Sequence, residues 1–522
     1  MLKKLHGRKL AVCLIGGAMY ALFSAFGWQA EHGGVIWAGG ALLVAALLVW
    51  PIAALLAVLL ERGYTRALRR EKTFRAGRAF AFMLACYVPM FCVAFPGSFA
   101  YDVPYQLRQV VTGAYSTHHP LLHTLVLGGL LQLGRALGDI NLGAALYTAL
   151  QMALLAGCFA LTCGSIARQS GARAAKRAAV FFALYPLNMV MAVNATKDVL
   201  FGGFFALTLA LLNEIQEKPS RGLALKIAAC GALAVMLRNN MAYAALVWLA
   251  ILTLGLRKAE KSAALAMLLA LAVGLCGNAA LKRATRAESG DMSEMLSWPI
   301  QQLARARLYD EDRLTDAEKE AIDELMPGEA WACYDQTISD PVKFEFDTQT
   351  FRADVKKYVG VWLSVGKKCA GTYLDATMAL TYPFFYPYRE YRVSGYYVQM
   401  GMSDAYDAGW CDFDPPESRS LFPRVLASLS WRFGAKGAMQ IPVVGWLFNM
   451  GVIVWTMLFF ALREMYWGRW RRFGTALLPV LLWGTFLLGP VMAGRYIYPF
   501  VCALPVLAAR PGRSVKEAAR HG

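Results

Sequence analysis

Long apolar runs recur along almost the whole chain, and they constrain its fold more than any other feature. A helix that crosses a membrane needs about 20 mostly apolar residues. Hydrophobic residues make up 57% of this chain and charged residues 17%, whereas a soluble domain has about 45–50% and about 25%. The sequence therefore predicts an all-α polytopic membrane protein and excludes an ordinary soluble enzyme. The twelve stretches that we expect to span the membrane are 11–27, 36–60, 79–95, 142–166, 178–193, 197–213, 223–237, 240–256, 263–280, 437–461, 473–490 and 495–509.

The basic residues follow the positive-inside rule if both termini are cytoplasmic. The cytoplasmic segments then contain 29 Lys and Arg residues. The short loops of the other side contain five, which are Arg108, Arg135, Lys197, Arg238 and Arg495. The net charge of +18 is thus a topological signal that also attracts anionic lipid, and no nucleic-acid partner is predicted.

The first apolar run resembles a signal peptide, but its removal would leave an odd number of spans, so we expect it to be uncleaved.

One apolar stretch, 121–133, is too short to span a membrane comfortably. The histidines His118, His119 and His123 lie at or near its start. Counting it as a span would place the strongly basic loop 168–177 on the outer side. We therefore expect a re-entrant or surface-lying helix here.

The region 282–436 is too long to be a connector. It holds 19 basic and 24 acidic residues, a net charge of 19 − 24 = −5. We expect it to be a helical extracytoplasmic insertion between a transmembrane core at 79–281 and C-terminal transmembrane helices with a basic tail at 437–522. Two transmembrane helices and a basic cytoplasmic loop are expected at 1–78, ahead of the core.

Three patterns predict structure inside the insertion. Thr315 followed by Glu318 forms a capping box that opens a helix at about 316–325. Residues 355–380 have the spacing of a helix that lies at a membrane surface. An aromatic run fits either an interfacial belt or a stacking surface for a sugar or lipid; its members are Tyr382, Phe384, Phe385, Tyr386, Tyr388, Tyr391, Tyr396 and Tyr397. One disulfide can form among Cys333, Cys369 and Cys411, and the sequence does not choose the pair.

The first candidate for chemistry is the outer loop that follows residue 95. Asp102 is the only acidic residue between Arg78 and Asp139, and the same loop continues to His118 and His119. An aspartate in such a loop is a solvated residue or a helix N-cap, or it is a general base. The cluster could also hold a divalent cation, or the histidines could only anchor the helix that follows.

Three further outer positions carry charges at or near membrane depth. Lys197 and Asp198 lie between two apolar runs, where ions are costly and usually paired. They form either a mutual tether or a site in which Asp198 binds a metal or an acceptor and Lys197 a phosphate. Arg238 and Arg495 run against the positive-inside bias. They are either interfacial anchors or phosphate ligands, since guanidinium suits bidentate phosphate recognition.

Together these residues predict a site for an anionic lipid phosphate with a divalent cation, Mg or Mn. The candidate catalytic residues are Asp102 and Asp198. The candidate metal ligands are Asp102, His118, His119 and Asp198. The candidate substrate or phosphate ligands are Lys197, Arg238, Arg495, Tyr498, Gln106 and Tyr115. No Walker motif or Rossmann fingerprint is present, so a nucleotide donor is not expected.

The order of these motifs resembles the GT-C superfamily of membrane glycosyltransferases, and within it an uncharacterised bacterial branch of multi-pass proteins. The resemblance covers roughly residues 80–505. It rests on the loop acid Asp102, on His118-His119-Pro120 before an apolar helix, on Thr196-Lys197-Asp198, on Arg238-Asn239-Asn240, on Gly494-Arg495-Tyr496-Ile497-Tyr498-Pro499, and on the stretches 297–326 and 338–346.

The resemblance implies a GT-C-like fold and a hexosyl- or pentosyltransferase. Such an enzyme moves a sugar from a polyprenyl-phosphate donor to an extracytoplasmic acceptor with inversion. The acceptor would be a cell-envelope glycan, a glycolipid or a protein. Asp102 would act as the base, Asp198 would position metal or acceptor, and Arg238 and Arg495 would hold the lipid phosphate. The chain departs from the family pattern in three ways. Two spans precede the helix that is usually the first, and the loop after the third span lacks the paired Asp-Glu or Asp-Asp of some relatives. The long insertion precedes the last three spans instead of forming a soluble C-terminal domain.

Three other functions fit parts of the pattern. A transporter or flippase of a lipid-linked or anionic substrate also has twelve spans, but it usually shows internal repeats, which this chain lacks. A polysaccharide polymerase or ligase would place its key residues in the large outer segment, for example at Arg389 and Arg392. A non-catalytic lipid-binding or assembly protein would bind the carrier lipid without turnover.

Overall fold

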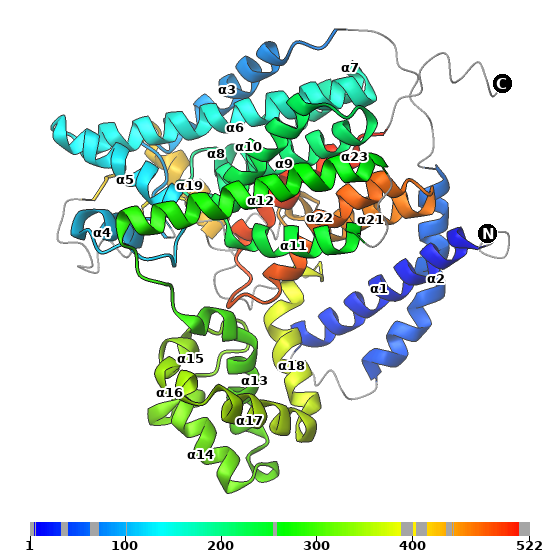
Figure 1. The fold of residues 1–522 in the computed structure, drawn as a ribbon, viewed down its shortest axis with the longest axis vertical. Coiled ribbons are helices and arrows are strands. Elements are labelled where there is room, and N and C mark those ends of the chain that lie inside the picture. Colours follow the sequence, from blue (N-terminus) through cyan, green and yellow to red (C-terminus); the bar gives the residue numbers. More distant parts are fainter. Residues whose placement is uncertain are drawn as a thin grey trace.

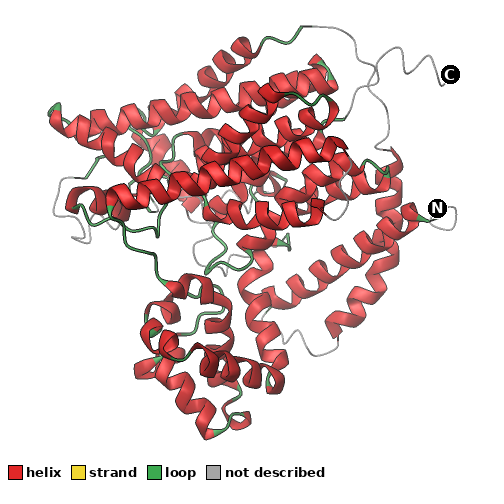
Figure 2. Cartoon of the chain, in the orientation of Figure 1, coloured by secondary structure: helices red, strands yellow, loops and turns green. Residues whose placement is uncertain are grey.

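The computed structural model describes residues 5, 7–32, 40–62, 73–100, 102–253, 258–387, 400–402, 415–434, 441 and 443–510. Figure 2 shows that this part of the chain consists of helices joined by loops. Extended pairing within it is limited to isolated bridges. The predicted all-α class is therefore confirmed.

Among the described residues, six helices are long and apolar enough to cross a membrane, which confirms a polytopic membrane protein. All six coincide with predicted spans. They are α1 (Arg8–Glu31), α2 (Gly40–Arg62), α3 (Ala76–Val93), α6 (Ile140–Ser170), α9 (Lys197–Glu217) and α12 (Lys258–Thr285).

The other six predicted spans correspond to shorter helices. The longest of these have 17 residues, a rise of about 26 Å, which is less than the roughly 30 Å of a hydrocarbon core. The count of twelve spans and the cytoplasmic termini therefore stay predictions. The helices are α7 (Ala172–Leu184) with α8 (Pro186–Ala192), α10 (Arg221–Leu237), α11 (Asn239–Thr253), α21 (Met450–Tyr466), α22 (Trp470–Phe486) and α23 (Tyr498–Ala508).

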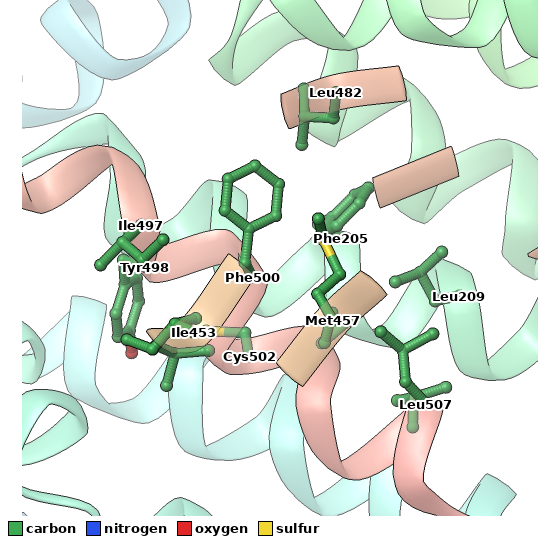
Figure 3. Packing of buried hydrophobic residues seen from close by; sticks show 14 of the residues in the cluster. Phe205, Leu209, Ile453, Met457, Leu482, Ile497, Tyr498, Phe500, Cys502 and Leu507 are labelled. Carbon is green, nitrogen blue, oxygen red and sulfur yellow. The ribbon is translucent and has the colours of Figure 1, made fainter. Parts of the chain in front are cut away.

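Helix α9 lies at the centre of the bundle (Figure 1) and contacts α6, α10 and α23. Its residues are apolar on all sides, as expected of a helix surrounded by protein. Gly202 allows the close approach of α23, since a Cβ there would lie 2.9 Å from Sγ of Cys502. Figure 3 shows Phe205 and Leu209 of α9 among apolar side chains of α21, α22 and α23. The first residues of this rigidly held helix are Lys197 and Asp198.

Two further helices lie on this side of the bundle. Helix α5 (Leu121–Ala136) packs on the long helix α6, and α4 (Val103–Thr112) packs on α5. Gly134 of α5 has no room for a Cβ, which would lie 2.3 Å from the backbone of Gly143 on α6. The predicted short helix at 121–133 is therefore present, and it packs tightly on α6.

Residues 292–381 form a helical lobe with its own apolar core, which includes Ile300, Ile322 and Val365. Figure 1 shows this lobe projecting from the bundle. Its helices are η2 (Met292–Leu296), α13 (Ser297–Tyr309), η3 (Glu311–Arg313), α14 (Asp316–Leu325), η4 (Pro327–Cys333), α15 (Asp340–Phe344), α16 (Thr348–Ala353), α17 (Val355–Lys368) and α18 (Ala370–Thr381). The capping box of Thr315 and Glu318 is present at the start of α14, as predicted.

The region 355–380 differs from its prediction. It forms two helices that break at Cys369 rather than one surface helix. Tyr358 and Val365 of α17 are buried in the lobe, because the apolar face of this helix packs on α13 and α14.

The first part of the aromatic run is also placed differently from either prediction. Tyr382, Phe384 and Phe385 are buried in the core of the bundle and form neither a belt nor an open stacking surface. Tyr386 reaches the core because Gly27 and Gly451 leave space for it. Tyr388, Tyr391, Tyr396 and Tyr397 lie outside the described residues, as do Arg389 and Arg392.

Of the three cysteines in the region 282–436, Cys333 is exposed, Cys369 is buried, and both are free. No bridge therefore joins these two residues. Cys411 lies outside the described residues.

Candidate active site

Two loops that are far apart in the sequence run side by side. The amide of Ser98 donates to the carbonyl of Val193 at 2.8 Å, and the amide of Ala195 donates to the carbonyl of Ser98 at 2.8 Å. Gly97 makes this turn possible, because its φ is 146° and a Cβ there would lie 2.2 Å from Oγ1 of Thr148. The first loop carries Asp102 to the start of α4, and the second leads directly to Lys197 at the start of α9.

Asp102 lies at the centre of a cluster of ion pairs. Its Oδ2 accepts a hydrogen bond from Nζ of Lys197 at 2.7 Å, and its Oδ1 accepts one from Nη2 of Arg495 at 2.9 Å. Nδ1 of His119 lies 3.7 Å from Oδ2. The Asp102 side chain is 19% exposed. Asp102 occupies the N-cap position of α4, but its side chain accepts no capping hydrogen bond. The carboxylate is therefore partly reachable from solvent and is engaged by cations rather than by the helix.

Asp198 provides a second, fully buried carboxylate. Its Oδ1 is in close contact with Nη1 of Arg238, and its Oδ2 lies 3.5 Å from Nε of Arg495. The mutual tether, one of the two alternatives for Lys197 and Asp198, is not formed, because each pairs with a partner from another part of the chain. Arg495 joins the two carboxylates into one cluster.

Arg238 and Arg495 are not interfacial anchors, since both residues are more than nine-tenths buried. The guanidinium of Arg238 lies 4.3 Å from the ring centroid of Phe486 and 4.5 Å from that of Tyr496. The Arg495 guanidinium lies 5.4 Å from the Tyr496 centroid. Such cation–π contacts hold a guanidinium in a fixed orientation. Tyr496 was not among the predicted site residues, and its only signal in the sequence is its position beside Arg495.

The cluster carries a net positive charge. Burial raises the pKa of Asp102, but the charges of Arg495 and Lys197 outweigh burial and hold that pKa well below its usual range. Burial is the main cause that holds the pKa of His119 well below its usual range, so His119 is neutral at pH 7. Three cations (Lys197, Arg238 and Arg495) against two carboxylates leave a charge of 3 − 2 = +1. A site of this charge favours an anionic ligand.

Three predicted ligands lie outside this cluster. Gln106 is buried, and its Nε2 donates to Oγ1 of Thr124 at 3.0 Å and lies 3.0 Å from Nδ1 of His123, so its amide is engaged by protein. Tyr498 is fully buried in the apolar core beside Cys502 (Figure 3). Tyr115 lies in the loop after α4, where its carbonyl accepts from the amide of Glu288 at 2.9 Å.

The four predicted metal ligands do not come together. His118 lies 3.9 Å from Glu294 of the lobe rather than beside Asp102, and both oxygens of Asp102 are bound by cations. Asp198 is enclosed by Arg238 and Arg495. Among the residues that the structure describes, no group of three or more His, Cys, Asp and Glu side chains could hold a metal ion. A divalent cation would have to bind among three positive side chains, so these residues do not fit it.

The lobe and the segment that leads into it are attached to both sides of the site by backbone hydrogen bonds. The amide of Thr117 donates at 2.9 Å to the carbonyl of Glu288, which lies four residues before the lobe, and Thr117 is next to His118 and His119. On the other side, the amide of Ser339 donates to the carbonyl of Pro490 at 2.8 Å, in the loop that leads to Arg495. The lobe thus helps to fix the loops that carry two members of the cluster.

A family model described as "Family of unknown function (DUF6020)" matches residues 110–521. This range contains Lys197, Asp198, Arg238 and Arg495 and begins after Asp102. No curated protein matches the chain. Among solved structures, the chain is similar to the crystal structure of ArnT from Cupriavidus metallidurans bound to undecaprenyl phosphate, with 14% identity over 83% of this chain and 78% of that chain, at a TM-score of 0.32. A likeness at this score carries no argument, so the function has to rest on the residues of the site.

Proposed function

Because the chain belongs to the DUF6020 family, whose function is unknown, its activity has to be inferred from its own residues, and we propose that it is a membrane glycosyltransferase. It moves a sugar from a polyprenyl-phosphate donor to a hydroxyl acceptor outside the cytoplasm, with inversion. The observation that carries the proposal is the carboxylate of Asp102, held between Lys197 and Arg495 in a partly exposed, net positive cluster. The order of motifs that resembles the GT-C superfamily supports the same function.

The cations of the cluster are suited to the phosphodiester of such a donor. Arg495 offers a planar guanidinium that binds two oxygens at once, and Lys197 offers a point charge. The Lys197 side chain is 14% exposed, that of Arg495 10% and that of Arg238 8%, so Lys197 is the most accessible cation. Arg238 lies over the rings of Phe486 and Tyr496 and pairs with Asp198. We therefore assign Lys197 and Arg495, which both contact Asp102, as the direct phosphate ligands, with Arg238 holding Asp198 in position.

The transfer is a single displacement. The acceptor oxygen forms a bond to the anomeric carbon from the face opposite the phosphate, while the bond between that carbon and the phosphate oxygen breaks. The electron pair leaves with polyprenyl phosphate, and the hydroxyl proton passes to Asp102. Lys197 and Arg495 stabilise the charge that develops on the phosphate. Attack from the opposite face inverts the anomeric configuration.

The ion pairs also give the order of events. A carboxylate paired with two cations is a weak base, because they stabilise its charged form. A bound phosphate draws Lys197 and Arg495 toward its own oxygens and adds a negative charge beside Asp102. Both effects raise the basicity of Asp102. Donor binding therefore precedes, and enables, the activation of the acceptor.

The test is an assay of purified protein with a panel of polyprenyl-phosphate monosaccharides, in which release of free polyprenyl phosphate is measured. We expect release with at least one donor and its loss in Asp102→Asn. If no donor is consumed although polyprenyl phosphate binds, the protein is a carrier-lipid transporter or an assembly protein, and the proposal is wrong.

A further inference from the structure

A chain of buried polar side chains runs from α4 through α5 to α6. Gln106 on α4 contacts His123 on α5 at 3.0 Å, and Nε2 of His123 lies 2.8 Å from the hydroxyl of Tyr147 on α6. That hydroxyl donates to Oε1 of Gln151 at 3.0 Å. All four side chains are at most 2% exposed. We call this chain the α4–α6 relay.

The direction of two hydrogen bonds in the relay follows from its geometry. Since the Tyr147 hydroxyl donates to Oε1 of Gln151, it accepts from Nε2–H of His123. The other ring nitrogen of His123, Nδ1, faces the side-chain amide of Gln106, whose Nε2 lies at 3.0 Å and whose Oε1 lies at 3.1 Å. Because these buried side chains contact one another, the network fixes the relative positions of α4, α5 and α6.

The two ends of the relay lie beside the two loops of the site. At one end, the backbone amide of Gln106 donates to the backbone carbonyl of Asp102 at 3.0 Å. At the other end, Nε2 of Gln151 donates to the carbonyls of Ala192 at 3.0 Å and Asn194 at 2.8 Å. Asn194 precedes Lys197 by three residues in the second loop.

We propose that Gln106, His123, Tyr147 and Gln151 are positioning residues that set the distance between Asp102 and Lys197. The inference rests on the proposed function, since it assigns these residues to the same reaction. They touch neither donor nor acceptor, because they are buried behind the loops. A displacement of about 1 Å at reacting groups can cost up to about 100-fold in rate, so a fixed spacing of base and phosphate ligand has a direct effect on transfer.

The experiment compares Tyr147→Phe with Tyr87→Phe in the full chain. Tyr87 is a matched control because its buried hydroxyl also donates one hydrogen bond, to the carbonyl of Phe182 at 2.8 Å, and lies outside the relay. Three quantities are measured for each variant: the midpoint of thermal unfolding, the rate of polyprenyl-phosphate release, and hydrogen exchange at the amides of Ser98, Ala195 and Thr196. A second pair, His123→Leu and His123→Gln, tests rescue, since glutamine can both donate and accept in the place of the imidazole.

We expect Tyr147→Phe to raise exchange at these three amides by about tenfold, the effect of one lost hydrogen bond, and to lower turnover by about 10- to 100-fold. Tyr87→Phe should lower the midpoint of thermal unfolding to a similar extent. It should leave the exchange at the three amides and the rate of polyprenyl-phosphate release as in the wild type. His123→Gln should recover most of what His123→Leu loses.

Equal turnover losses in the two tyrosine variants, or unchanged exchange at the three amides in Tyr147→Phe, would overturn the proposal. Hydrogen exchange does not depend on turnover. If the wild-type protein consumes no donor, the proposed function fails, and the exchange measurement still decides whether the relay holds the two loops together.

Discussion

Asp102 and Arg495 are 393 residues apart in the sequence, and Oδ1 of Asp102 accepts a hydrogen bond from Nη2 of Arg495 at 2.9 Å. The same guanidinium reaches Asp198 through Nε at 3.5 Å. One planar group thus connects the exposed carboxylate of the site with the buried one. A lysine has a single nitrogen and cannot reproduce this contact.

Arg495→Lys should therefore keep the charge of the site but lose its geometry. We expect affinity for polyprenyl phosphate to fall by about tenfold, since a bidentate contact becomes a single one. The dissociation constant can be measured in nanodiscs. Arg419→Lys is the control, because Arg419 makes one exposed ion pair, with Asp139. Equal affinity in Arg495→Lys and wild type would remove Arg495 from the phosphate site.

Asp102→Asn should abolish transfer and leave the fold intact. Loss of a general base typically costs about 10²–10⁴ in rate, and an amide of the same shape fits the same space. Initial rates of polyprenyl-phosphate release report the effect, and thermal unfolding reports the fold. Asp139→Asn removes another loop carboxylate that pairs with an arginine, and it should retain wild-type rates. Wild-type turnover in Asp102→Asn would end the assignment of this residue as the base.

The buried pair of Arg238 and Asp198 should dominate the stability of this region. Removing one partner of a buried ion pair leaves an uncompensated charge and costs about 3–5 kcal/mol, so Asp198→Asn and Arg238→Met should each unfold at a markedly lower temperature. The double variant should recover part of the loss, because no charge remains unpaired. The measurement is a double-mutant cycle by thermal unfolding. Additive losses would mean that the two side chains do not interact.

The lobe should lose stability in acid through Glu318. Burial opposes its ionisation, but hydrogen bonds from Lys368, the amide of Thr315 and Ser364 outweigh burial and lower its pKa from 4.5 to about 2. A depressed pKa contributes stability that is complete above the unfolded value of 4.5 and disappears as the pH falls toward 2.

Glu318→Gln keeps the capping box, because glutamine at this position can also accept from the amide of Thr315, but it loses the ion pair with Lys368. The variant should therefore destabilise α14 by about 1 kcal/mol at pH 7. The difference from wild type should shrink between pH 4.5 and pH 2. This difference in stability is measured by hydrogen exchange of the α14 amides in the full chain, corrected for the intrinsic exchange rate at each pH. Glu320→Gln, on the exposed side of the same helix, is the control. A difference that stays constant with pH would contradict this account of Glu318.

Chelation should leave the proposed transfer unchanged. The carboxylates that could bind Mg²⁺ or Mn²⁺ are already paired with arginine and lysine. Polyprenyl-phosphate release is measured after EDTA treatment and after re-addition of each metal. Loss of turnover with EDTA and its recovery with metal would show that the ion pairs rearrange to admit a cation.

The sequence predicted the membrane class and the capping box because those depend on local patterns. Apolar runs and charge bias specify α1, α2, α3, α6, α9 and α12 directly. Thr315 and Glu318 lie three residues apart, so their contact is visible in the sequence. Asp102, Lys197 and Arg495 were selected as candidates because isolated charges between apolar runs are rare, and their roles stay predictions.

Other features depend on contacts between distant segments, which no local pattern records. The partner of Asp198 could not be predicted, since Lys197 is its neighbour but Arg238 is its partner. Gln106 was expected to face a ligand, whereas it faces His123 because α5 lies against α4 on that side. Tyr382 and Phe384 are aromatic, as belts require, but Gly27 and Gly451 make room for this segment in the core.

The attachment of the lobe has a consequence for inhibition. Ser339 is bonded to Pro490, five residues before Arg495, through a contact that lies outside the apolar core. A molecule that separates the 335–339 segment from the 490–491 loop would displace Arg495, the proposed phosphate ligand, without competing with donor or acceptor.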